Sequence, residues 1–216
     1  KYDKFLAENY DYKANTYETN KINLLSNPTS LYAKQPTVYY GLMYLAKNAK
    51  KEVKIHTPYI ICNDYMYNEL KNIKVPTTIM TNSAENNGNI FGAVDYLNHK
   101  KDIINTGVTI KEYEGGISYH GKSMTIDDDI AIVGSFNMDM RSAYIDTELM
   151  LVINSKYINK QLKASMEEYE KKAATVKNET EYSHIPEEMK MKELSDKKKN
   201  IKAWFGWAMN GLRFLF

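Results

Sequence analysis

The stretch of residues 118–148 places the tightest constraint on how this chain can fold. His120 and Lys122 are two residues apart, so in a strand both side chains project from one face. Three consecutive aspartates, 127–129, form a polar turn, and the short apolar run 130–133 is the strand that returns. The pattern therefore predicts a β-hairpin that presents an imidazole and an ammonium group side by side.

The polar groups on and just after this hairpin suit a phosphate better than a metal ion. Ser135 and Asn137 follow the returning strand, and Glu148 stands ahead of the next apolar run. Lysine and asparagine hold phosphoryl oxygens by charge and hydrogen bonds, and a histidine can attack phosphorus or move a proton. A carboxylate such as Glu148, placed behind His120, can fix the tautomer of the ring and stabilise its charged form. We therefore expect phosphodiester chemistry with no metal and no cofactor.

Six residues match the pattern H-x-K-x4-D-x6-G-S-x2-N at every fixed position: His120, Lys122, Asp127, Gly134, Ser135 and Asn137. This pattern resembles the HKD motif of the phospholipase D superfamily, in which a glutamate downstream of the asparagine commonly orients the histidine. Glu148 stands at the matching place. The resemblance implies catalytic roles for His120, Lys122, Asp127 and Glu148, and phosphate binding by Lys122, Ser135 and Asn137. The position of Asp127 in the turn indicates that it braces the hairpin more than it touches substrate.

Shorter stretches on both sides of the motif resemble the second half of bacterial cardiolipin synthases. They are residues 25–28, 57–61, 80–83, 107–113 and 136–142, and the resemblance covers about residues 21–155. It implies a phosphatidyltransferase that makes cardiolipin from two phosphatidylglycerol molecules through a phosphohistidine intermediate. Three alternatives remain open: hydrolysis of phospholipids to phosphatidic acid, a homodimeric phosphodiesterase or nuclease, and a non-catalytic module at the membrane.

The chain carries one such motif, whereas the superfamily reaction, as the resemblance implies it, uses two. None of His56, His99 and His184 opens a second complete motif. The partner motif then lies upstream in a longer protein, which we favour, or in a second copy paired about a two-fold axis. In two-motif relatives the second histidine is usually assigned as the acid and base, and the resemblance carries that role to His120.

Charge and hydropathy limit the choice of partners. The chain has 29 basic and 27 acidic side chains, a net charge of +2, and this balance gives no reason to expect nucleic acid as a partner. No apolar run reaches the roughly 18 residues of a membrane-spanning helix. Lysines 197–199 precede Trp204, Trp207 and Phe214, a composition that suits either the headgroup region of a bilayer or packing on the domain or on the missing half. The expected partners are a phospholipid, the other motif-bearing half and a membrane surface, at a bacterial cell membrane reached peripherally or through a missing N-terminal segment.

The order of helices and strands predicts an α/β fold, a mixed β-sheet flanked by helices that forms a phospholipase D-like half-domain. Helices are expected at 36–49, 64–72, 91–106 and 155–174, and strands at 53–57, 77–81 and 108–113 before the motif hairpin. We divide the chain into a linker or upstream tail at 1–20, the domain at 21–175, and a charged connector with an aromatic C-terminal segment at 176–216.

Several other polar positions are weighed as site or structural residues. His56 is expected to be a packed histidine beside the sheet rather than a catalyst. Asn82 and Ser83 follow a strand end, where loops often line ligand sites, so they either touch substrate or satisfy a turn. Asp64 is expected to cap the helix that follows it. Cys62, the one cysteine, is expected to be a small buried apolar residue.

Overall fold

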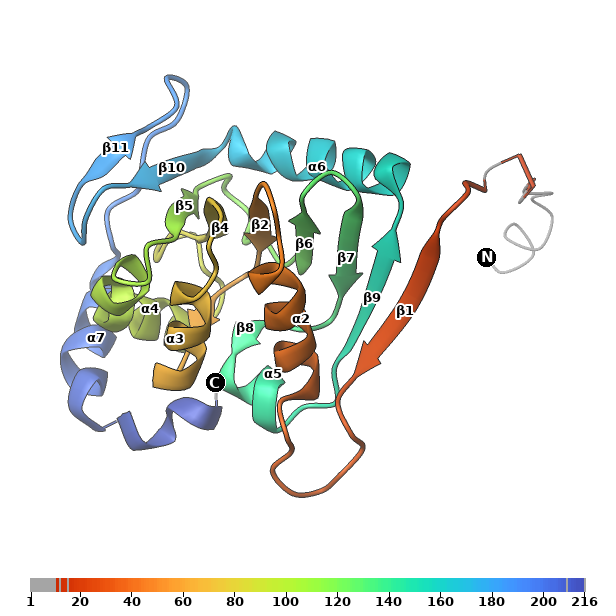
Figure 1. The fold of residues 1–216 in the computed structure, drawn as a ribbon. Coiled ribbons are helices and arrows are strands. Elements are labelled where there is room, and N and C mark those ends of the chain that lie inside the picture. Colours follow the sequence, from red (N-terminus) through yellow and green to blue (C-terminus); the bar gives the residue numbers. More distant parts are fainter. Residues whose placement is uncertain (1–10, 12, 15, 209, 216) are drawn as a thin grey trace, which may run out of the picture.

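The computed structural model describes residues 11, 13–14, 16–208 and 210–215, without the side chains of residues 204–208 and 210. Among these residues the chain forms a nine-stranded mixed β-sheet with helices on both faces (Figure 1). This architecture confirms the predicted α/β fold with a mixed sheet flanked by helices. Much of the stretch expected as a linker, residues 1–20, lies outside the described residues.

The strands of the large sheet come from the whole length of the described chain. They are β1 (Lys21–Ser26), β2 (Val53–His56), β4 (Thr77–Asn82), β5 (Thr109–Tyr113), β6 (Ser123–Ile126), β7 (Ile130–Gly134), β9 (Leu149–Asn154), β10 (Ala173–Val176) and β11 (Tyr182–His184). Their order in space is β1-β9-β7-β6-β2-β4-β5-β10-β11. β2, β4 and β5 run parallel to one another, and the other neighbours are antiparallel. Two short strands, β3 (Ile60–Ile61) and β8 (Met138–Asp139), pair separately.

Helices cover both faces of the sheet. They are α2 (Thr37–Lys47), α3 (Asp64–Lys71), α4 (Ile90–Ile104), α5 (Met140–Tyr144), α6 (Lys156–Glu170) and α7 (Asp196–Ala208), followed by a short 3-10 helix, η1 (Asn210–Leu215). In Figure 1, α6 lies on the side of the sheet away from the other helices. α2 shows why these helices pack: Val38, Leu42 and Ala46 repeat at helical spacing, and all three are buried.

The carboxyl ends of the parallel strands and the start of the motif hairpin meet at one edge of the sheet. β2 pairs with β4 in parallel and with β6 antiparallel, so His56 lies beside both Met80 and Ser123. β4 in turn ends at Asn82, opposite Tyr113 at the end of β5. The ends of parallel strands are where open α/β sheets bind ligands, and the motif histidine precedes β6 at this edge.

The predicted hairpin is present as β6 and β7, and its turn is tied to the body of the domain. Asp127 has a φ of 53°, in the left-handed region that aspartate adopts more readily than most residues. Its carboxylate accepts hydrogen bonds from the backbone N–H groups of Lys50, Lys51 and Glu52 at distances between 2.7 and 3.2 Å. Asp127 therefore braces the hairpin, as its place in the turn indicates.

Gly134 ends β7 at a point where no side chain fits. A Cβ atom there would lie 2.1 Å from the carbonyl oxygen of Leu149 and 2.9 Å from Cα of Met150. Both are backbone atoms of the neighbouring strand β9, so they cannot move aside as a side chain could. The glycine of the motif thus lets two strands approach closely. Its N–H also donates to the carbonyl oxygen of Lys122 at 3.3 Å, which joins the end of β7 to the segment before β6.

The predicted helix 155–174 ends at Glu170, and the chain then returns to the sheet. Ala173, Ala174 and Thr175 pair with the end of β5, so small side chains that fit a helical pattern lie instead in β10. The sheet extends past the boundary expected at residue 175 and continues into β11. The stretch expected as a connector therefore contains the last residue of β10 and one whole strand, β11, of the same sheet.

Two other local features differ from the sequence-based prediction. Residues 21–26 form β1, a strand that the prediction does not include, and it pairs with β9 along its whole length. α3 is capped by Asn63 rather than Asp64: the Asn63 side chain accepts a hydrogen bond from the N–H of Met66 at 2.9 Å. The cap lies one residue earlier because Asp64 is already the first helical residue.

The C-terminal segment packs on the domain where the structure describes it. Arg213 binds both carboxylate oxygens of Asp95 on α4, at 2.6 and 3.0 Å, and the carbonyl oxygen of the buried Cys62 at 2.9 Å. The side chains of Trp204 and Trp207, which motivate the membrane-surface alternative, lie outside the described residues. In the described part of the chain, no helix has the length and apolarity needed to cross a bilayer.

Candidate active site

His120 stands in an irregular segment just before β6, and its side chain is exposed. The Nζ atom of Lys122 lies 2.9 Å from Nδ1 of His120, 3.5 Å from Nε2 of the same ring and 2.9 Å from the His120 carbonyl oxygen. The structure therefore places the imidazole and the ammonium group side by side, as the spacing predicts. Neither residue belongs to the strand itself, which begins at Ser123.

Burial and neighbouring charges shift the pKa values of both groups. Partial burial lowers the pKa of His120, and the positive charge of Lys122 lowers it further. Burial also lowers the pKa of Lys122, while the negative charges of Glu148 and Asp139 act in the opposite direction. An imidazole titrates near pH 6.5 when unperturbed, so the lowered pKa leaves the ring neutral at pH 7. Because the ammonium donates toward Nδ1, a neutral ring carries its proton on Nε2.

Ser135, Asn137 and Glu148 form a second group, joined by Ser142. The buried carboxylate of Glu148 accepts a short hydrogen bond from Oγ of Ser135 and one of 2.8 Å from Oγ of Ser142. Oγ of Ser142 in turn accepts from both the side-chain amide and the backbone N–H of Asn137, each at 3.2 Å. Oδ1 of Asn137 is buried and has no hydrogen-bond partner among the described residues. This network fixes the turn that follows β7.

The structure brings His120 and Lys122 together but does not join every predicted member to them. Glu148, expected behind the imidazole ring, is bonded to Ser135 and Ser142 and, among the described contacts, not to His120. The reason is its position: Glu148 is buried under the turn, where two hydroxyl groups satisfy its oxygens, whereas the ring lies on the exposed side. Asn137 likewise directs its amide nitrogen inward, at Ser142.

Asp127 lies at the opposite end of the hairpin from His120. Burial would raise the pKa of its carboxyl group, but the hydrogen bonds from the backbone N–H groups of Lys50, Lys51 and Glu52 outweigh it and lower the pKa. A carboxylate engaged in this way is an anchor for the backbone. The structure thus separates Asp127 from the groups around His120, in contrast to the catalytic role that the motif implies.

A pocket of about 750 Å³ opens beside His120 and Lys122. Its lining includes residues 117–123, Val133, and Ser165, Tyr169 and Lys172 from α6 and the residues after it. The rings of Tyr119 and Tyr169 pack edge to face, with centroids 4.8 Å apart. The pocket thus combines two lysines with a tyrosine wall. It is large enough for a phosphodiester together with both substituents of the phosphate.

Asn82 and Ser83 are not among the residues that line this pocket. Asn82 is buried, and its side chain is hydrogen-bonded to both backbone groups of Tyr119, at 2.8 and 2.9 Å. Ser83 donates a short hydrogen bond to Glu114. The structure therefore favours a structural role for both residues. Asn82 satisfies the backbone of the motif segment, and Ser83 accepts a hydrogen bond from the N–H of Asn86 in its own turn.

His56 is buried, as expected, but within an ionic cluster that the sequence does not predict. Its Nε2 lies 3.2 Å from Oε1 of Glu170, and its Nδ1 lies 3.3 Å from the hydroxyl of Tyr119. Burial lowers the pKa of His56. Burial would raise the pKa of Glu170, but hydrogen bonds from His56 and Lys111 and the charge of Lys54 lower it to about 2. The cluster ties the end of α6 to β2 and to the motif segment.

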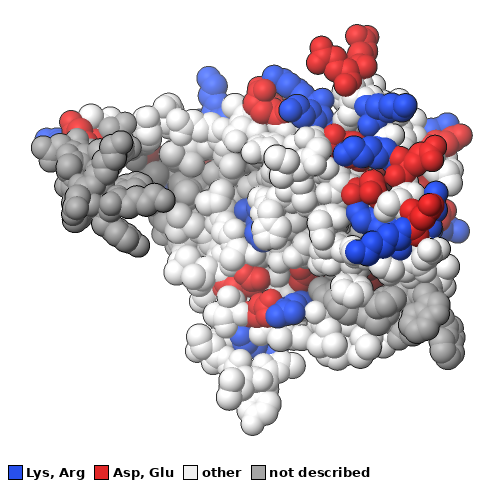
Figure 2. Space-filling model, turned by 180° about the vertical axis from the view of Figure 1, so that it is seen from behind, with Lys and Arg blue, Asp and Glu red and all other residues white. Residues whose placement is uncertain are grey.

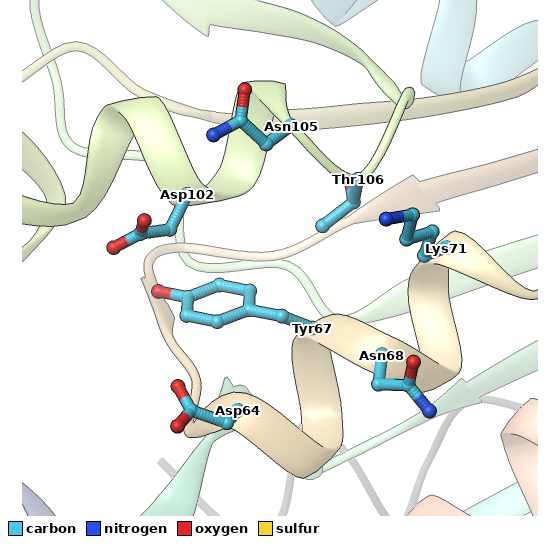
Figure 3. A pocket seen from close by; sticks show the side chains of 7 residues that line it. All are labelled: Asp64, Tyr67, Asn68, Lys71, Asp102, Asn105 and Thr106. Carbon is cyan, nitrogen blue, oxygen red and sulfur yellow. The ribbon is translucent and has the colours of Figure 1, made fainter.

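A second cavity, of about 250 Å³, lies between α3 and the end of α4 (Figure 3). Tyr67 lies across it, with the carboxylates of Asp64 and Asp102 toward one end and Lys71 toward the other. None of its seven lining residues borders the pocket at His120, and none is a histidine. This cavity has opposed charges but no pair of groups suited to phosphoryl transfer.

The charged surface gives no indication of a nucleic-acid groove on the face seen from behind. Figure 2 shows Lys and Arg interspersed with Asp and Glu on the side of β10 and β11, while the middle of this face is largely uncharged. A nucleic-acid backbone is usually followed by a stripe of basic side chains. Within the described residues, no three His, Cys, Asp or Glu side chains converge as a possible metal site.

Two residues that organise the site are not apparent from the motif. Ser142 links Asn137 to Glu148, and its own N–H donates to the side chain of Asp139 at 2.6 Å. The spacing of Asp139 and Ser142 is that of a helix N-cap, which is a usable signal. Asn27 donates to the carbonyl oxygen of Ser142 at 2.8 Å across 115 residues of sequence, and no local pattern indicates such a contact.

The chain is similar in sequence to bacterial lipid enzymes. The family model described as “Cardiolipin synthase, PLD-like domain” matches residues 42–169, which is more than half of the chain. “Cardiolipin synthase 1” of Staphylococcus epidermidis is 30% identical over 159 residues, covering 72% of this chain and 32% of that protein. The chain therefore spans about a third of the length of this relative.

Two solved structures share the fold. Phosphatidylserine synthase of Haemophilus influenzae has a TM-score of 0.63 and 17% identity, covering 88% of this chain and 46% of that one. Nuc of Salmonella typhimurium, described as a phospholipase D family member, has a TM-score of 0.57 and 16% identity, covering 72% of this chain and 97% of that one. Identities this low show a common arrangement of sheet and helices, and nothing more.

Proposed function

Because this chain belongs to the family of cardiolipin synthase, phospholipase D-like domains, we propose that it supplies one half of the active site of a phosphatidyltransferase. The proposed reaction joins two phosphatidylglycerol molecules, releases glycerol and forms cardiolipin. The observation that carries the proposal is the Lys122 ammonium, 2.9 Å from Nδ1 of the exposed His120 at the mouth of a pocket. A cation and an acid–base group so close together can act on one phosphoryl group.

A phosphodiester in this pocket changes the state of both groups. Its negative charge attracts the Lys122 ammonium, which in the free protein contacts Nδ1 and the carbonyl oxygen of His120. Movement of the ammonium to a phosphoryl oxygen frees Nδ1, and the nearby negative charge raises the pKa of His120. The ring then becomes protonated at the stage when a leaving group needs a proton.

We assign His120 the acid and base role, and the nucleophile to the histidine of the other half. That histidine attacks phosphorus, the P–O bond to the glycerol headgroup breaks, and His120 gives its proton to the leaving oxygen. His120 then takes the proton from a hydroxyl group of the second phosphatidylglycerol. The oxygen of this hydroxyl attacks the phosphorus of the phosphohistidine, and the histidine of the other half leaves. The phosphohistidine divides one hard displacement into two easier ones.

Ser135 is the member of the Glu148 network that we assign to phosphate binding, because it is the exposed one. In the free protein its hydroxyl donates to Glu148. It therefore has to turn to donate to a phosphoryl oxygen. Asn137, whose amide nitrogen is bonded to Ser142, needs a similar rotation to serve as a phosphate ligand. Glu148 supports the turn that carries both.

The second half of the site is proposed to come from another part of the same protein. About two thirds of the relative from Staphylococcus epidermidis lie outside the aligned region, which leaves room for that half. Beside the site, Leu24, Leu151 and Val133 lie in one row across β1, β9 and β7, and Leu24 and Val133 are 61% and 37% exposed. We infer that this exposed apolar row is covered by another domain. Val133 also lines the pocket at His120, so a domain on this row would reach the site.

The proposed substrate places the reaction at a bilayer surface. The sequence relative is bacterial, so we propose a bacterial cell membrane. Attachment is proposed to be peripheral or through a segment outside this chain.

The test uses the full-length protein, vesicles of phosphatidylglycerol and thin-layer chromatography of the products. Cardiolipin formed with an equal amount of glycerol supports the proposal. Phosphatidic acid without cardiolipin would identify water as the acceptor and replace transfer by hydrolysis. Cleavage of DNA in a parallel assay, without lipid turnover, would instead favour a nuclease.

A further inference from the structure

The segment that carries His120, residues 114–122, belongs to no helix or strand. Its backbone groups do not take part in the regular hydrogen bonding of a helix or sheet, so its position depends on individual hydrogen bonds. These bonds come largely from one stretch, residues 82–89, which consists of the last residue of β4 and the loop that follows it, and which we call the loop 82–89. The placement of His120 therefore depends on how firmly this loop is held.

Asn82 makes the central contact between the loop and the segment. Its side chain is 1% exposed; Oδ1 accepts from the N–H of Tyr119 at 2.8 Å, and Nδ2 donates to the carbonyl oxygen of Tyr119 at 2.9 Å. Nδ2 also donates to the carbonyl oxygen of Pro58 at 2.8 Å, which ties the amide to the end of β2. One side chain thus holds both backbone groups of the residue next to His120, as a neighbouring strand would.

The same loop binds the two residues before Tyr119. Nδ2 of Asn86 donates to the carbonyl oxygen of Ile117 at 3.2 Å, and it also contacts Oδ1 of Asn82 at 3.2 Å. The N–H of Gly88 donates to Oγ of Ser118 at 3.1 Å. Three consecutive residues ahead of the catalytic histidine are therefore attached to this one loop.

A lysine from the C-terminal helix α7 binds three backbone carbonyl groups of this loop. Lys198 is 8% exposed, and its ammonium donates to the carbonyl oxygens of Ala84, Glu85 and Asn87 at 2.8, 2.6 and 3.0 Å. An ammonium group has three donors, and all three are used here. Without it, three carbonyl groups, two of them buried, would lose this partner, which costs stability and favours rearrangement of the loop. Lys198 lies outside the range of the family match, residues 42–169.

We propose that Asn82 is a positioning residue for His120 and that Lys198 holds it in place through the loop 82–89. This inference rests on the proposed function, in which His120 transfers protons. A displacement of a reacting group by about 1 Å can lower turnover about 100-fold. Loss of either contact should therefore appear in kcat rather than in lipid binding. The proposal gives the C-terminal helix a part in catalysis.

The first test compares Asn82→Leu with a matched control, Asn159→Leu, in the full-length protein. Asn159 is also 1% exposed, and its side chain donates to one backbone carbonyl, that of Ile130, at the far end of the hairpin. Asn82→Leu is expected to lower kcat by about 100-fold, with a much smaller change in KM. Asn159→Leu is expected to lose thermal stability to a similar extent and to keep kcat within about twofold of the wild type.

A second readout does not depend on turnover. Diethyl pyrocarbonate modifies neutral imidazoles, so its rate of reaction with His120 across pH, followed by mass spectrometry, gives the pKa of that ring. We expect a value below about 6.5 in the wild type and a rise toward it in Asn82→Leu, where Lys122 no longer lies beside the ring. Folded Asn82→Leu protein with unchanged kcat and unchanged His120 pKa would overturn the proposal. An equal loss of kcat in Asn159→Leu would do the same.

Should Asn82→Leu fail to fold, Lys198→Met decides, with Lys100→Met as its control. Lys100 is also buried, but it pairs with Glu112 at 2.7 Å, away from the loop. Lys198→Met is expected to lower kcat about tenfold and to shift the His120 pKa, whereas Lys100→Met does neither. Equal kcat in the two variants overturns the proposal. A wild-type protein without lipid turnover would count against the proposed function alone, because the modification assay still reports where His120 lies.

Discussion

The ammonium group of Lys122 lies 2.9 Å from Nδ1 of His120 and equally far from the carbonyl oxygen of the same residue. In the free protein this contact helps to keep the ring neutral, because a positive charge beside an imidazole disfavours a second one. Both groups line one pocket, so a single phosphoryl group can meet both. The acidity of His120 is therefore coupled to the position of Lys122.

Lys122→Met removes the charge but keeps most of the side-chain volume. The pKa of His120 is expected to rise, because one of its two lowering causes is lost while partial burial remains. Turnover should fall by about 100- to 1000-fold, as is typical when one group that stabilises developing charge is removed. The pH dependence of kcat/KM in the full-length protein measures both effects, and the limb that belongs to His120 should move to higher pH. Lys122→Arg, which keeps the charge, should leave that limb in place; a limb unmoved by Lys122→Met would show that the two groups are uncoupled.

Asp127→Ala is expected to destabilise the fold without disabling the chemistry. The carboxylate accepts from three backbone N–H groups, and loss of hydrogen bonds to a charged acceptor costs about 1–3 kcal/mol. Thermal unfolding should show this loss, while kcat of the folded protein stays near that of the wild type. Asp127→Asn keeps one acceptor oxygen, so its thermal stability should lie between those of the wild type and Asp127→Ala. A large loss of kcat at unchanged stability would return Asp127 to the catalytic group.

In Glu170→Gln the free energy of unfolding should change less with pH in the acid range than in the wild type. The folded-state pKa of Glu170, about 2, lies below the ordinary value of 4.5. A carboxyl group with a depressed pKa stabilises the fold above its unfolded pKa, and this contribution is lost as the pH falls from 4.5 toward 2. The variant should be less stable by about 2 kcal/mol at pH 7, since it loses charged hydrogen bonds to His56 and Lys111, and the difference should shrink by pH 3. Unfolding curves at both pH values decide, and a difference that is the same at both would exclude this account.

Leu24→Glu tests the apolar row on β1, β9 and β7. A charge on this row should weaken the packing of the second half and lower turnover of the full-length protein by about tenfold or more. Because Leu24 is 61% exposed in this chain, the chain's own stability should change little. Leu31→Glu is the control, since Leu31 is fully exposed in the loop after β1. Equal turnover in Leu24→Glu and Leu31→Glu would show that the row is not covered.

The hairpin could be predicted from sequence because its signals are local. The spacing of His120 and Lys122, the aspartate turn and the returning apolar run lie within a few residues of one another. Gly134 belongs to the same local pattern, although its reason, the close approach of Leu149 and Met150, appears only in the structure. Local patterns therefore identify the elements of the site and the proximity of its two central groups.

The remaining parts of the site depend on which distant groups meet in the interior. Glu148 stands at the place where the resemblance expects a partner for His120, but two nearby serines satisfy it. Asn82 has the sequence context of a loop residue at a ligand site, yet it binds the backbone of Tyr119, 37 residues away. β10 fits a helical pattern, and pairing with β5 overrides it. Such outcomes follow from tertiary contacts, which spacing along the chain does not determine.

The most direct test of the central claim is the product pattern of His120→Asn in the full-length protein, with phosphatidylglycerol labelled in its headgroup glycerol. The wild type should release labelled glycerol as cardiolipin forms. His120→Asn should bind the same vesicles, because Lys122 and the pocket remain, but should form neither product, since no group is left to move the proton. Cardiolipin formation by His120→Asn at a rate near that of the wild type would contradict the account.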